Sequence, residues 1–191
     1  MACELKLYHN FLIEKDCDRL LKKYSDGLQE SQTLGRYIEG YRVAENRWIY
    51  DIEDPLIKGI VTRISMLTGK PIENQEKPNL IKYDIGGEYK HHHDYFSLDE
   101  NFPDQYENCM NQGGQRTHTA ILYLNDDFTG GETDFPSLGI KVTPQKGLLC
   151  IWNNVNELGE VEPDSFHAGL PVITGRKWIL ISWVRERAFG T

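Results

Sequence analysis

Apolar residues recur at helical spacing in two segments of the first third of the chain. The first segment, residues 14–28, carries them at Cys17, Leu20, Leu21, Tyr24 and Leu28. The second, residues 53–71, carries them at Ile57, Ile60, Val61, Ile64 and Leu67. Asp54 and Pro55 suit the start of the second helix, and Gly69 and Pro71 suit its end. The pattern predicts two supporting amphipathic helices, and residues 41–51 between them fit a strand or a loop.

From Asn79 onward the pattern changes to short runs rich in β-branched and aromatic residues. The runs occupy residues 79–85, 117–126, 140–144, 147–152, 169–173 and 177–187. Gly, Pro and Asn-Asp separate them, as is typical of strands joined by turns. No helical pattern alternates with the runs, so a mainly β sandwich or jelly roll is favoured over an α/β fold. We expect one domain over residues 1–191, with helical support over about 1–78 and a β core over about 79–187.

One connection is too long for an ordinary turn. Residues 97–115 are polar and end on a pair of glycines. A structureless connection of this length is often a functional lid, although a flexible insertion fits the sequence equally well. As a lid it would cover a bound peptide with Phe102, Tyr106 and Met110. Its acidic residues would favour a peptide with basic flanks, and they are Asp99, Glu100, Asp104 and Glu107.

Composition and charge narrow the classes of function. The 191 residues are 39% hydrophobic, which suits a globular protein, and the formal net charge is −8. Nucleic acids and anionic membranes are bound through basic patches, so neither is the expected partner. The four cysteines follow no disulfide or metal-binding spacing. No uninterrupted apolar run approaches about 18 residues, so no signal peptide or membrane span is visible. We expect free thiols and a cytoplasmic protein.

Three histidines and an aspartate follow one another at positions 91–94. Non-haem Fe(II) oxygenases hold iron with two histidines and one carboxylate and leave the opposite face of the metal open. Because alternate side chains of a strand share a face, His92 and Asp94 can bind a metal together. His91 and His93 form a competing pair on the other face, as in cupins, and would leave the aspartate unused.

A third ligand has to come from a distant strand. His9 precedes the first helix, outside the strand region, and His118 is out of phase with the alternating set that follows it. His167 precedes a strand that carries two cations, Arg176 and Lys177. A buried cation near an iron site is what a dicarboxylic co-substrate needs, because its distal carboxylate must be paired when it leaves water.

Four linked motifs extend over about residues 83–183. The first reads Tyr-x-x-Gly-x-x-Tyr-x-x-His-x-Asp-x-Phe, from Tyr83 to Phe96. The others are "RTHTAILYLN" at 116–125, "GGETDFP" at 130–136 and "FHAGLPVITGRKW" at 166–178. In this order they resemble the prolyl 4-hydroxylase-type 2-oxoglutarate- and Fe(II)-dependent dioxygenases. The chain departs from the family pattern at Gly87, where the family has glutamine.

The resemblance implies a distorted double-stranded β-helix (jelly roll) with Fe(II) held by His92, Asp94 and His167. It further implies that 2-oxoglutarate is decarboxylated by O2 to succinate and CO2 while an unactivated C–H bond is hydroxylated. In this family that carbon is usually C4 of a peptidyl proline, and L-ascorbate is the expected reductant. The cofactor supplies the difficult chemistry and the protein orients it. The segment 130–136 is expected to be a structural turn.

The resemblance also implies which residues contact the co-substrate. In the prolyl 4-hydroxylase branch, a lysine ten residues after the distal histidine pairs with the distal carboxylate, which is Lys177 here. A related branch uses an arginine one position earlier, which is Arg176. The tryptophan that follows fits the lysine branch, so Lys177 is preferred. Tyr83, Thr119 and Tyr123 are expected to hydrogen-bond the co-substrate.

Two other functions fit the sequence less well. One is an oxygenase of the same chemistry that acts on a free amino acid or a small molecule. The other is a non-catalytic, cupin-like metal-binding module, which would need neither a buried Lys177 nor 2-oxoglutarate. The expected partner is a proline-containing peptide or protein.

Overall fold

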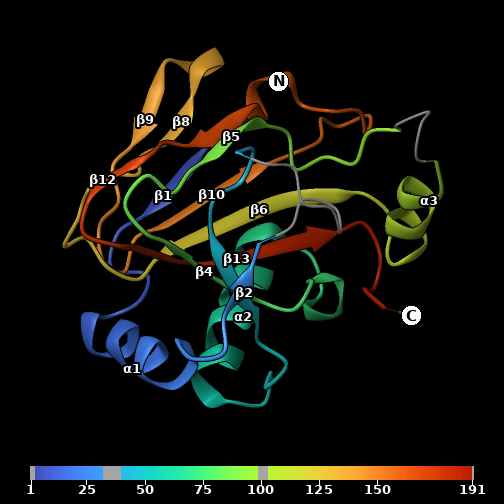
Figure 1. The fold of residues 1–191 in the computed structure, drawn as a ribbon. Helices are drawn as coiled ribbons and strands as arrows, with labels where there is room; N and C mark the ends of the chain where they lie inside the picture. Colours follow the sequence, from blue (N-terminus) through green and yellow to red (C-terminus); the bar gives the residue numbers. More distant parts are fainter. Residues whose placement is uncertain (1–2, 32–39, 99–102, 191) are drawn as a thin grey trace.

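The fold is organised around a seven-stranded antiparallel sheet (Figure 1). The computed structural model describes residues 3–31, 40–98 and 103–190. In spatial order the strands are β1 (Lys6–Tyr8), β10 (Leu149–Asn153), β6 (Arg116–Tyr123), β13 (Lys177–Arg185), β4 (Asn79–Tyr83), β3 (Glu45–Trp48) and β2 (Gln29–Glu30). The two longest strands, β6 and β13, pair along their length near the middle of the sheet. We call this the larger sheet.

A smaller antiparallel sheet packs against one face of the larger sheet. Its strands, in spatial order, are β5 (Tyr89–His92), β11 (His167–Gly169), β8 (Thr133–Phe135) and β9 (Ile140–Val142). A two-stranded pair, β7 (Thr129–Gly130) and β12 (Val172–Thr174), adjoins them. Figure 1 shows β8, β9 and β5 on one side of the larger sheet, and α1 and α2 on the other. The predicted mainly β sandwich is therefore confirmed.

Three α-helices accompany the sheets: α1 (Glu14–Tyr24), α2 (Pro55–Thr68) and α3 (Pro103–Asn111). The sequence signals at the ends of α2 act as predicted. The side chain of Asp54 accepts hydrogen bonds from the backbone N–H groups of Leu56 and Ile57, and Gly69 ends the helix in the left-handed region with φ 65°. Short 3₁₀ turns cover Ile72–Asn74, Pro136–Leu138 and Pro163–Ser165.

Each face of the larger sheet carries its own apolar core, as the alternation of its strands requires. Along β13, Leu180 and Val184 pack with the buried residues of α1 and α2. The residues that alternate with this set, Ile179, Ile181 and Trp183, pack toward β8 and β9. The second core therefore lies between the two sheets, and the candidate site described below opens at its edge.

The first third of the chain is less helical than its apolar pattern predicts. Strands β1, β2 and β3 all come from this part and join the larger sheet. With two to four residues each, they are too short for a periodic pattern to show. Of the three, β3 falls within residues 41–51, which the sequence left open as a strand or a loop. The first helix ends at Tyr24, so Leu28 lies beyond it. Leu67, at the end of the second stripe, is 37% exposed.

The segment 97–115 is not structureless, because α3 occupies nine of its residues. The helix turns Tyr106 and Met110 inward, where both are half-buried, and leaves Asp104 and Glu107 exposed. These two carboxylates lie on the solvent side of the helix, and a preference for peptides with basic flanks stays a prediction. The remaining residues named for the lid, Asp99, Glu100 and Phe102, lie outside the described residues.

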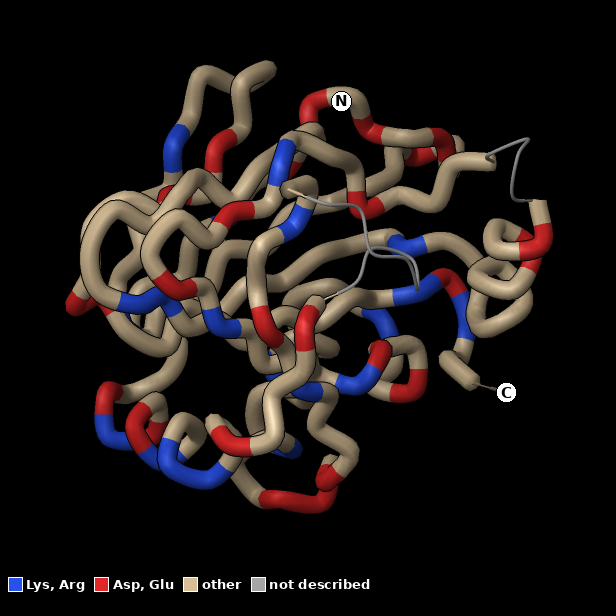
Figure 2. Tube along the Cα trace, viewed as in Figure 1, with Lys and Arg blue, Asp and Glu red and all other residues tan. Residues whose placement is uncertain are grey.

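The surface and the thiols agree with the simple expectations from composition. Figure 2 shows basic and acidic residues interspersed over the trace. All four cysteines are free; Cys109 is partly buried and the other three are buried. Among the described residues, no helix combines the length and the apolar character needed to cross a membrane.

Candidate metal centre and co-substrate pocket

The smaller sheet brings two distant histidines together. Strands β5 and β11 are antiparallel, and His92 is the direct partner of His167 across them. The centres of the two imidazole rings are 4.4 Å apart. Asp94 follows just beyond the end of β5. Because directly paired residues project to the same face of a sheet, both imidazoles and the carboxylate converge on one point.

Backbone carbonyl groups fix the orientation of both imidazoles. Nδ1 of His92 lies 2.7 Å from the carbonyl oxygen of Lys90, and Nδ1 of His167 lies 2.8 Å from that of Ser165. A carbonyl oxygen only accepts, so each Nδ1 carries the proton and Nε2 keeps its lone pair. Nε2 of His92 is 3.5 Å from Oδ1 of Asp94, and Nε2 of His167 is 3.8 Å from Oδ2.

Burial and charge favour the protonation states that a metal requires. Burial alone would raise the pKa of Asp94, but the polar groups around it, first among them His92, hold it well below its usual range. Burial, together with the neighbouring His92, lowers the pKa of His167 to about 4. One donor atom from each of the three residues lies within 4.8 Å of the others. Two nitrogens and a carboxylate oxygen at this spacing can hold one metal ion.

The other histidines have different partners. Nε2 of His91 is 3.0 Å from Oδ2 of Asp134, and Nδ1 of His93 is 3.2 Å from Oγ of Ser165. Over the described parts of the chain, the cluster of His92 and its two partners is the one group of three that could hold a metal. The competing pair of histidines therefore has no third ligand there.

Lys177 is buried beside two tyrosines of the larger sheet. The residue is 3% exposed, and its Nζ lies 5.2 Å from the ring centre of Tyr83 and 5.7 Å from that of Tyr123. Nζ donates a 2.6 Å hydrogen bond to the carbonyl oxygen of Gly131. Burial lowers the pKa of Lys177 to about 8, so the side chain is mostly charged at neutral pH.

The preceding cation faces the opposite way. Nε of Arg176 lies 2.6 Å from Oδ1 of Asp84, and both side chains are more than half exposed. Of the two cations considered from the sequence, Lys177 is thus the buried one, and Arg176 belongs to a solvated ion pair.

The segment 130–136, expected only as a turn, packs against Lys177. Gly131 has φ +69°, and a Cβ atom there would lie 3.1 Å from Cδ of Lys177. A side chain at this position would strain the backbone and crowd the lysine. Oγ1 of Thr133 lies 2.6 Å from the hydroxyl of Tyr123. The motif therefore shapes the space around the ammonium group.

The three residues expected to hydrogen-bond a co-substrate do not share one environment. Tyr83 and Tyr123 face Lys177. Thr119 instead faces the group of His92, Asp94 and His167, and its hydroxyl donates a 2.6 Å hydrogen bond to Asp94.

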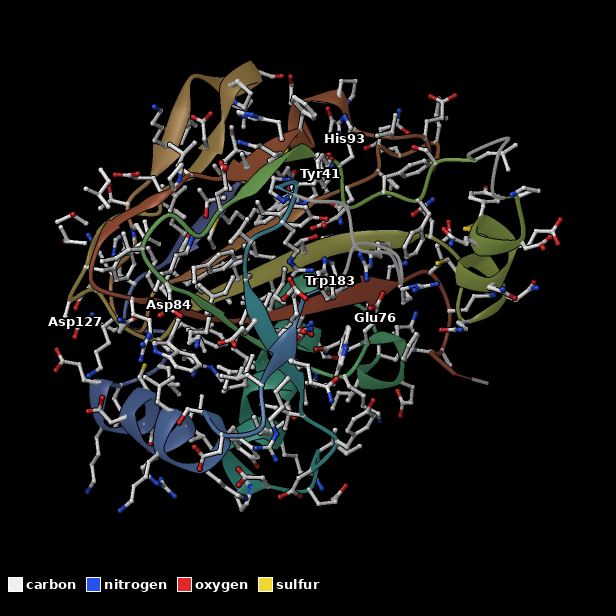
Figure 3. The ribbon with its side chains drawn as sticks, in the orientation of Figure 1. Tyr41, Glu76, Asp84, His93, Asp127 and Trp183 are labelled. Carbon is white, nitrogen blue, oxygen red and sulfur yellow. The ribbon has the colours of Figure 1, made fainter. Side chains whose placement is uncertain are left out.

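An open groove leads from the surface to the candidate metal-binding side chains, His92 and Asp94 among them. The cavity measures about 1030 Å³. Its aromatic lining includes Tyr41, Trp48, Tyr89, Phe166 and Trp183. In Figure 3, Tyr41 and His93 lie above Trp183 and Glu76, and all four line this groove. The groove is large enough, and open enough, to admit an extended ligand.

A buried ion triad that the sequence analysis missed supports the groove. Glu76 accepts hydrogen bonds from Arg116 at 2.7 and 2.9 Å and from Arg185 at 2.8 Å. The guanidinium of Arg116 lies 3.9 Å from the ring centre of Trp183, and Arg185 donates to the carbonyl of Gly114. The motif at residues 116–125 includes Arg116 but assigned it no role, and no local signal marks Glu76 or Arg185 as its partners.

Comparison with known proteins decides the family. Residues 78–185 match the family described as the 2OG-Fe(II) oxygenase superfamily. The chain belongs to this superfamily. The resemblance found in the sequence is therefore confirmed. Membership in the 2OG-Fe(II) oxygenases implies Fe(II), 2-oxoglutarate and O2, and the donor set of the buried cluster fits Fe(II).

Individual 2OG-Fe(II) oxygenases similar to this chain are prolyl 4-hydroxylases. A putative prolyl 4-hydroxylase of Acanthamoeba polyphaga mimivirus is 31% identical over 95% of this chain and 74% of its own length. Prolyl 4-hydroxylase subunit alpha-1 of Gallus gallus is 36% identical over 77% of this chain. The chain spans only 28% of that subunit's length. A viral collagen prolyl hydroxylase from Paramecium Bursaria Chlorella virus-1, solved with 2OG, has a TM-score of 0.75 and 28% identity, with 95% of each chain covered.

Proposed function

We propose that this chain is a 2-oxoglutarate- and Fe(II)-dependent dioxygenase that hydroxylates peptidyl proline at C4 and releases succinate and CO2. The observation that carries the proposal is the buried cluster of His92, Asp94 and His167, which has the donor set of non-haem Fe(II) oxygenases. Similarity to prolyl 4-hydroxylases over most of the chain supports the choice of substrate. The proposed catalytic unit is a single domain over residues 1–191.

The roles proposed for the three ligands follow from their chemistry. Two neutral imidazoles and one carboxylate leave a bound Fe(II) with a net positive charge, which attracts an anionic co-substrate. Bound iron supplies O2 activation and the oxidative decarboxylation of 2-oxoglutarate. Aromatic rings hold the imidazoles in place. The ring of Tyr89 stacks on that of His92 with 3.6 Å between ring centres, and the ring centre of Trp152 lies 4.7 Å from that of His167. This packing also limits the access of water to the cluster.

Lys177 is the proposed partner of the distal carboxylate of 2-oxoglutarate. A carboxylate that enters a buried pocket has to be paired there, and a buried ammonium is a suitable partner. Tyr83 and Tyr123 beside the ammonium would donate hydrogen bonds from their hydroxyl groups to the same carboxylate. Gly169 lies beside the ammonium as well, since a Cβ there would be 3.9 Å from Nζ of Lys177.

The groove favours a peptide over a free amino acid. Its volume of about 1030 Å³ is at the upper end of the range for small-molecule sites. A free amino acid would leave most of this space empty. Proline-rich peptides adopt an extended polyproline conformation, and grooves lined by aromatic rings bind that conformation. Tyr41, Trp48 and Trp183 provide such rings.

The test combines two measurements on the purified chain with Fe(II) and 2-oxoglutarate. Succinate release reports co-substrate turnover, and mass spectrometry reports the gain of one oxygen on a panel of proline peptides, free proline and host-lysate proteins. We expect one oxygen on peptidyl proline per succinate, with the hydroxyl at C4. Oxygen on free proline alone would favour the small-molecule oxygenase. Metal binding without any succinate would favour the non-catalytic module.

The same assay tests the proposed reductant. L-Ascorbate should return the iron to Fe(II) after turnovers that oxidise no peptide. Omitting it should leave the first turnovers intact and shorten the progress curve. A progress curve that is unchanged without ascorbate would remove the reductant from the proposal.

A further inference from the structure

Two buried polar side chains extend from the metal cluster into the core between the sheets. Thr119, on β6, is fully buried, and its Oγ1 lies 2.6 Å from Oδ2 of Asp94. Asn154, directly after β10, is also fully buried, and its Nδ2 lies 2.8 Å from the same hydroxyl. Strand pairing holds them in place, because the backbone N–H of Asn154 donates to the carbonyl of Thr117 at 2.8 Å.

The chemistry of these groups allows one direction for the chain of hydrogen bonds. An amide nitrogen only donates, and an ionised carboxylate only accepts. The oxygen of Thr119 therefore accepts from Asn154, and its single proton points to Asp94. The 2.6 Å distance is in the range of strong charge-assisted O–H···O⁻ bonds. With that proton committed, the hydroxyl cannot also donate to a co-substrate.

We propose that Thr119 and Asn154 are positioning residues for the carboxylate ligand. They engage Oδ2 of Asp94, so that Asp94 presents Oδ1 alone to the metal. Carboxylates bind metals through one or both oxygens, and a second oxygen would take a position that the co-substrate or O2 needs. This inference rests on the proposed ligand role of Asp94. It also gives Thr119 a different role from the co-substrate contact that the sequence resemblance implies.

The decisive substitution removes the hydroxyl and keeps the shape. Thr119→Val should weaken Co(II) binding, measured anaerobically without 2-oxoglutarate, by roughly 10–100-fold, and Thr119→Ser should bind within about threefold of the unmodified chain. The visible absorption of the Co(II)-saturated protein should also change in Thr119→Val, because the aspartate is then free to bind through both oxygens.

A matched control lies two positions away on the same strand and face. The hydroxyl of Thr117 is buried and donates to the carbonyl of Val184 at 3.2 Å. Thr117→Val should lower the melting temperature to a similar extent as Thr119→Val. It should leave the Co(II) affinity and the Co(II) spectrum unchanged, since its hydroxyl contacts the carbonyl of Val184 and Nδ1 of His118 and none of the proposed ligands. A purely structural role for Thr119 would make the two variants alike.

Asn154 supplies a second, independent variant. Asn154→Leu has a similar shape but no donor, and it should weaken Co(II) binding by less than Thr119→Val, because the threonine proton is only less well oriented. In a Thr119→Val background, Asn154→Leu should change the Co(II) affinity no further, because both act through one hydrogen bond. Additive losses would mean that the two residues act separately. If Thr119→Val does not fold, the Co(II) affinity of Asn154→Leu tests the proposal by itself, and an unchanged affinity would count against it.

Two results would overturn the inference. One is equal Co(II) affinity in Thr119→Val and Thr117→Val. The other is a Thr119→Val protein that keeps its Co(II) affinity and loses only 2-oxoglutarate affinity, which would make the threonine a co-substrate contact. Asp94→Ala in the same titration tests the ligand assignment itself. Retained Co(II) binding in Asp94→Ala would refute the proposed metal centre, whereas its loss, with no effect at Thr119, would refute only the positioning role.

Discussion

Replacing Lys177 by methionine tests two effects of the buried cation, its cost to the stability of the free protein and its contribution to co-substrate binding. Methionine keeps an unbranched side chain of similar length and removes the ammonium. In the free protein that ammonium donates to the carbonyl of Gly131 at 2.6 Å, and burial lowers its pKa from 10.5 to about 8. The charge is therefore disfavoured until a carboxylate arrives, and one substitution should move binding and stability in opposite directions.

The expected loss of binding follows from the burial of the side chain. A hydrogen bond to a charged group contributes roughly 1.5–3 kcal/mol. At about 1.4 kcal/mol for each factor of ten, Lys177→Met should weaken 2-oxoglutarate binding by roughly 10–150-fold. Because the lysine is 3% exposed, water cannot take over its role, and we expect a value in the upper half of that range.

The same substitution should stabilise the free protein. The unfolded chain holds the Lys177 proton with a pKa of 10.5 and the folded chain with a pKa of about 8. The charged lysine therefore destabilises the fold fully below pH 8, and this effect disappears as the pH rises from 8 to 10.5. By linkage it amounts to about 3 kcal/mol. Lys177→Met should raise the melting temperature by several degrees at pH 7, and the gain should vanish above about pH 10.

Calorimetry on the Zn(II)-loaded protein, which cannot turn over, measures the binding side. Arg176→Met is the matched control, since it removes an exposed cation one position earlier and should leave the affinity within about twofold. In the unmodified chain, 2-oxoglutarate affinity should fall as the pH rises above 8, because the lysine loses its proton. Equal affinity in Lys177→Met and the unmodified chain, or a larger loss in Arg176→Met, would refute the reasoning.

Three further predictions concern the three proposed ligands, the ion triad and the surroundings of Lys177. Alanine at any of the three proposed ligands should abolish both metal retention on dialysis and succinate release. His91→Ala and His93→Ala should retain metal. Loss of metal in His91→Ala, with retention in His92→Ala, would mean that the alternate histidines are the ligands. Glu76→Gln leaves two buried arginines without their counter-charge and should lower the free energy of unfolding in urea by roughly 3–5 kcal/mol; a change below about 1 kcal/mol would show that the triad does not stabilise the fold. Gly131→Ala strains a backbone at φ +69° and crowds Lys177, so calorimetry should show weaker 2-oxoglutarate binding at unchanged metal affinity; equal losses of both would mean a general distortion.

The parts of the fold that could be predicted are those whose signals are local. Asp54 and Gly69 mark the ends of α2 through their own side chain and backbone. The long strands β6 and β13 show their alternation directly. The strand β5 has no such pattern, because Tyr89–His92 carries no apolar alternation. Its extended state depends on pairing with β11, which no window of sequence contains.

The same distinction applies to the site. The spacing of His92 and Asp94 is local, and together with the motif around His167 it pointed to residues that the fold does bring together. The role of Asn154 could not be predicted, because it lies among other polar residues and its partner is 35 positions away. Glu76 meets Arg185 across 109 positions. Periodicity identifies the face of a strand but not the partner opposite it.

His92 pairs directly with His167 across β5 and β11. Metal binding at the candidate centre therefore depends on these two strands staying paired. β5 comes last in the strand order of that sheet, and beyond it the pairing continues as an isolated bridge between Arg42 and Tyr89. With so little pairing on its other side, β5 is where we expect local opening to begin. A metal bound by both histidines links the two strands through their side chains and stabilises only the closed form. Iron supply would thus set the lifetime of the protein as well as its activity, since proteases cleave chains that open. Equal rates of proteolysis with and without Co(II) would contradict this link between metal supply and turnover.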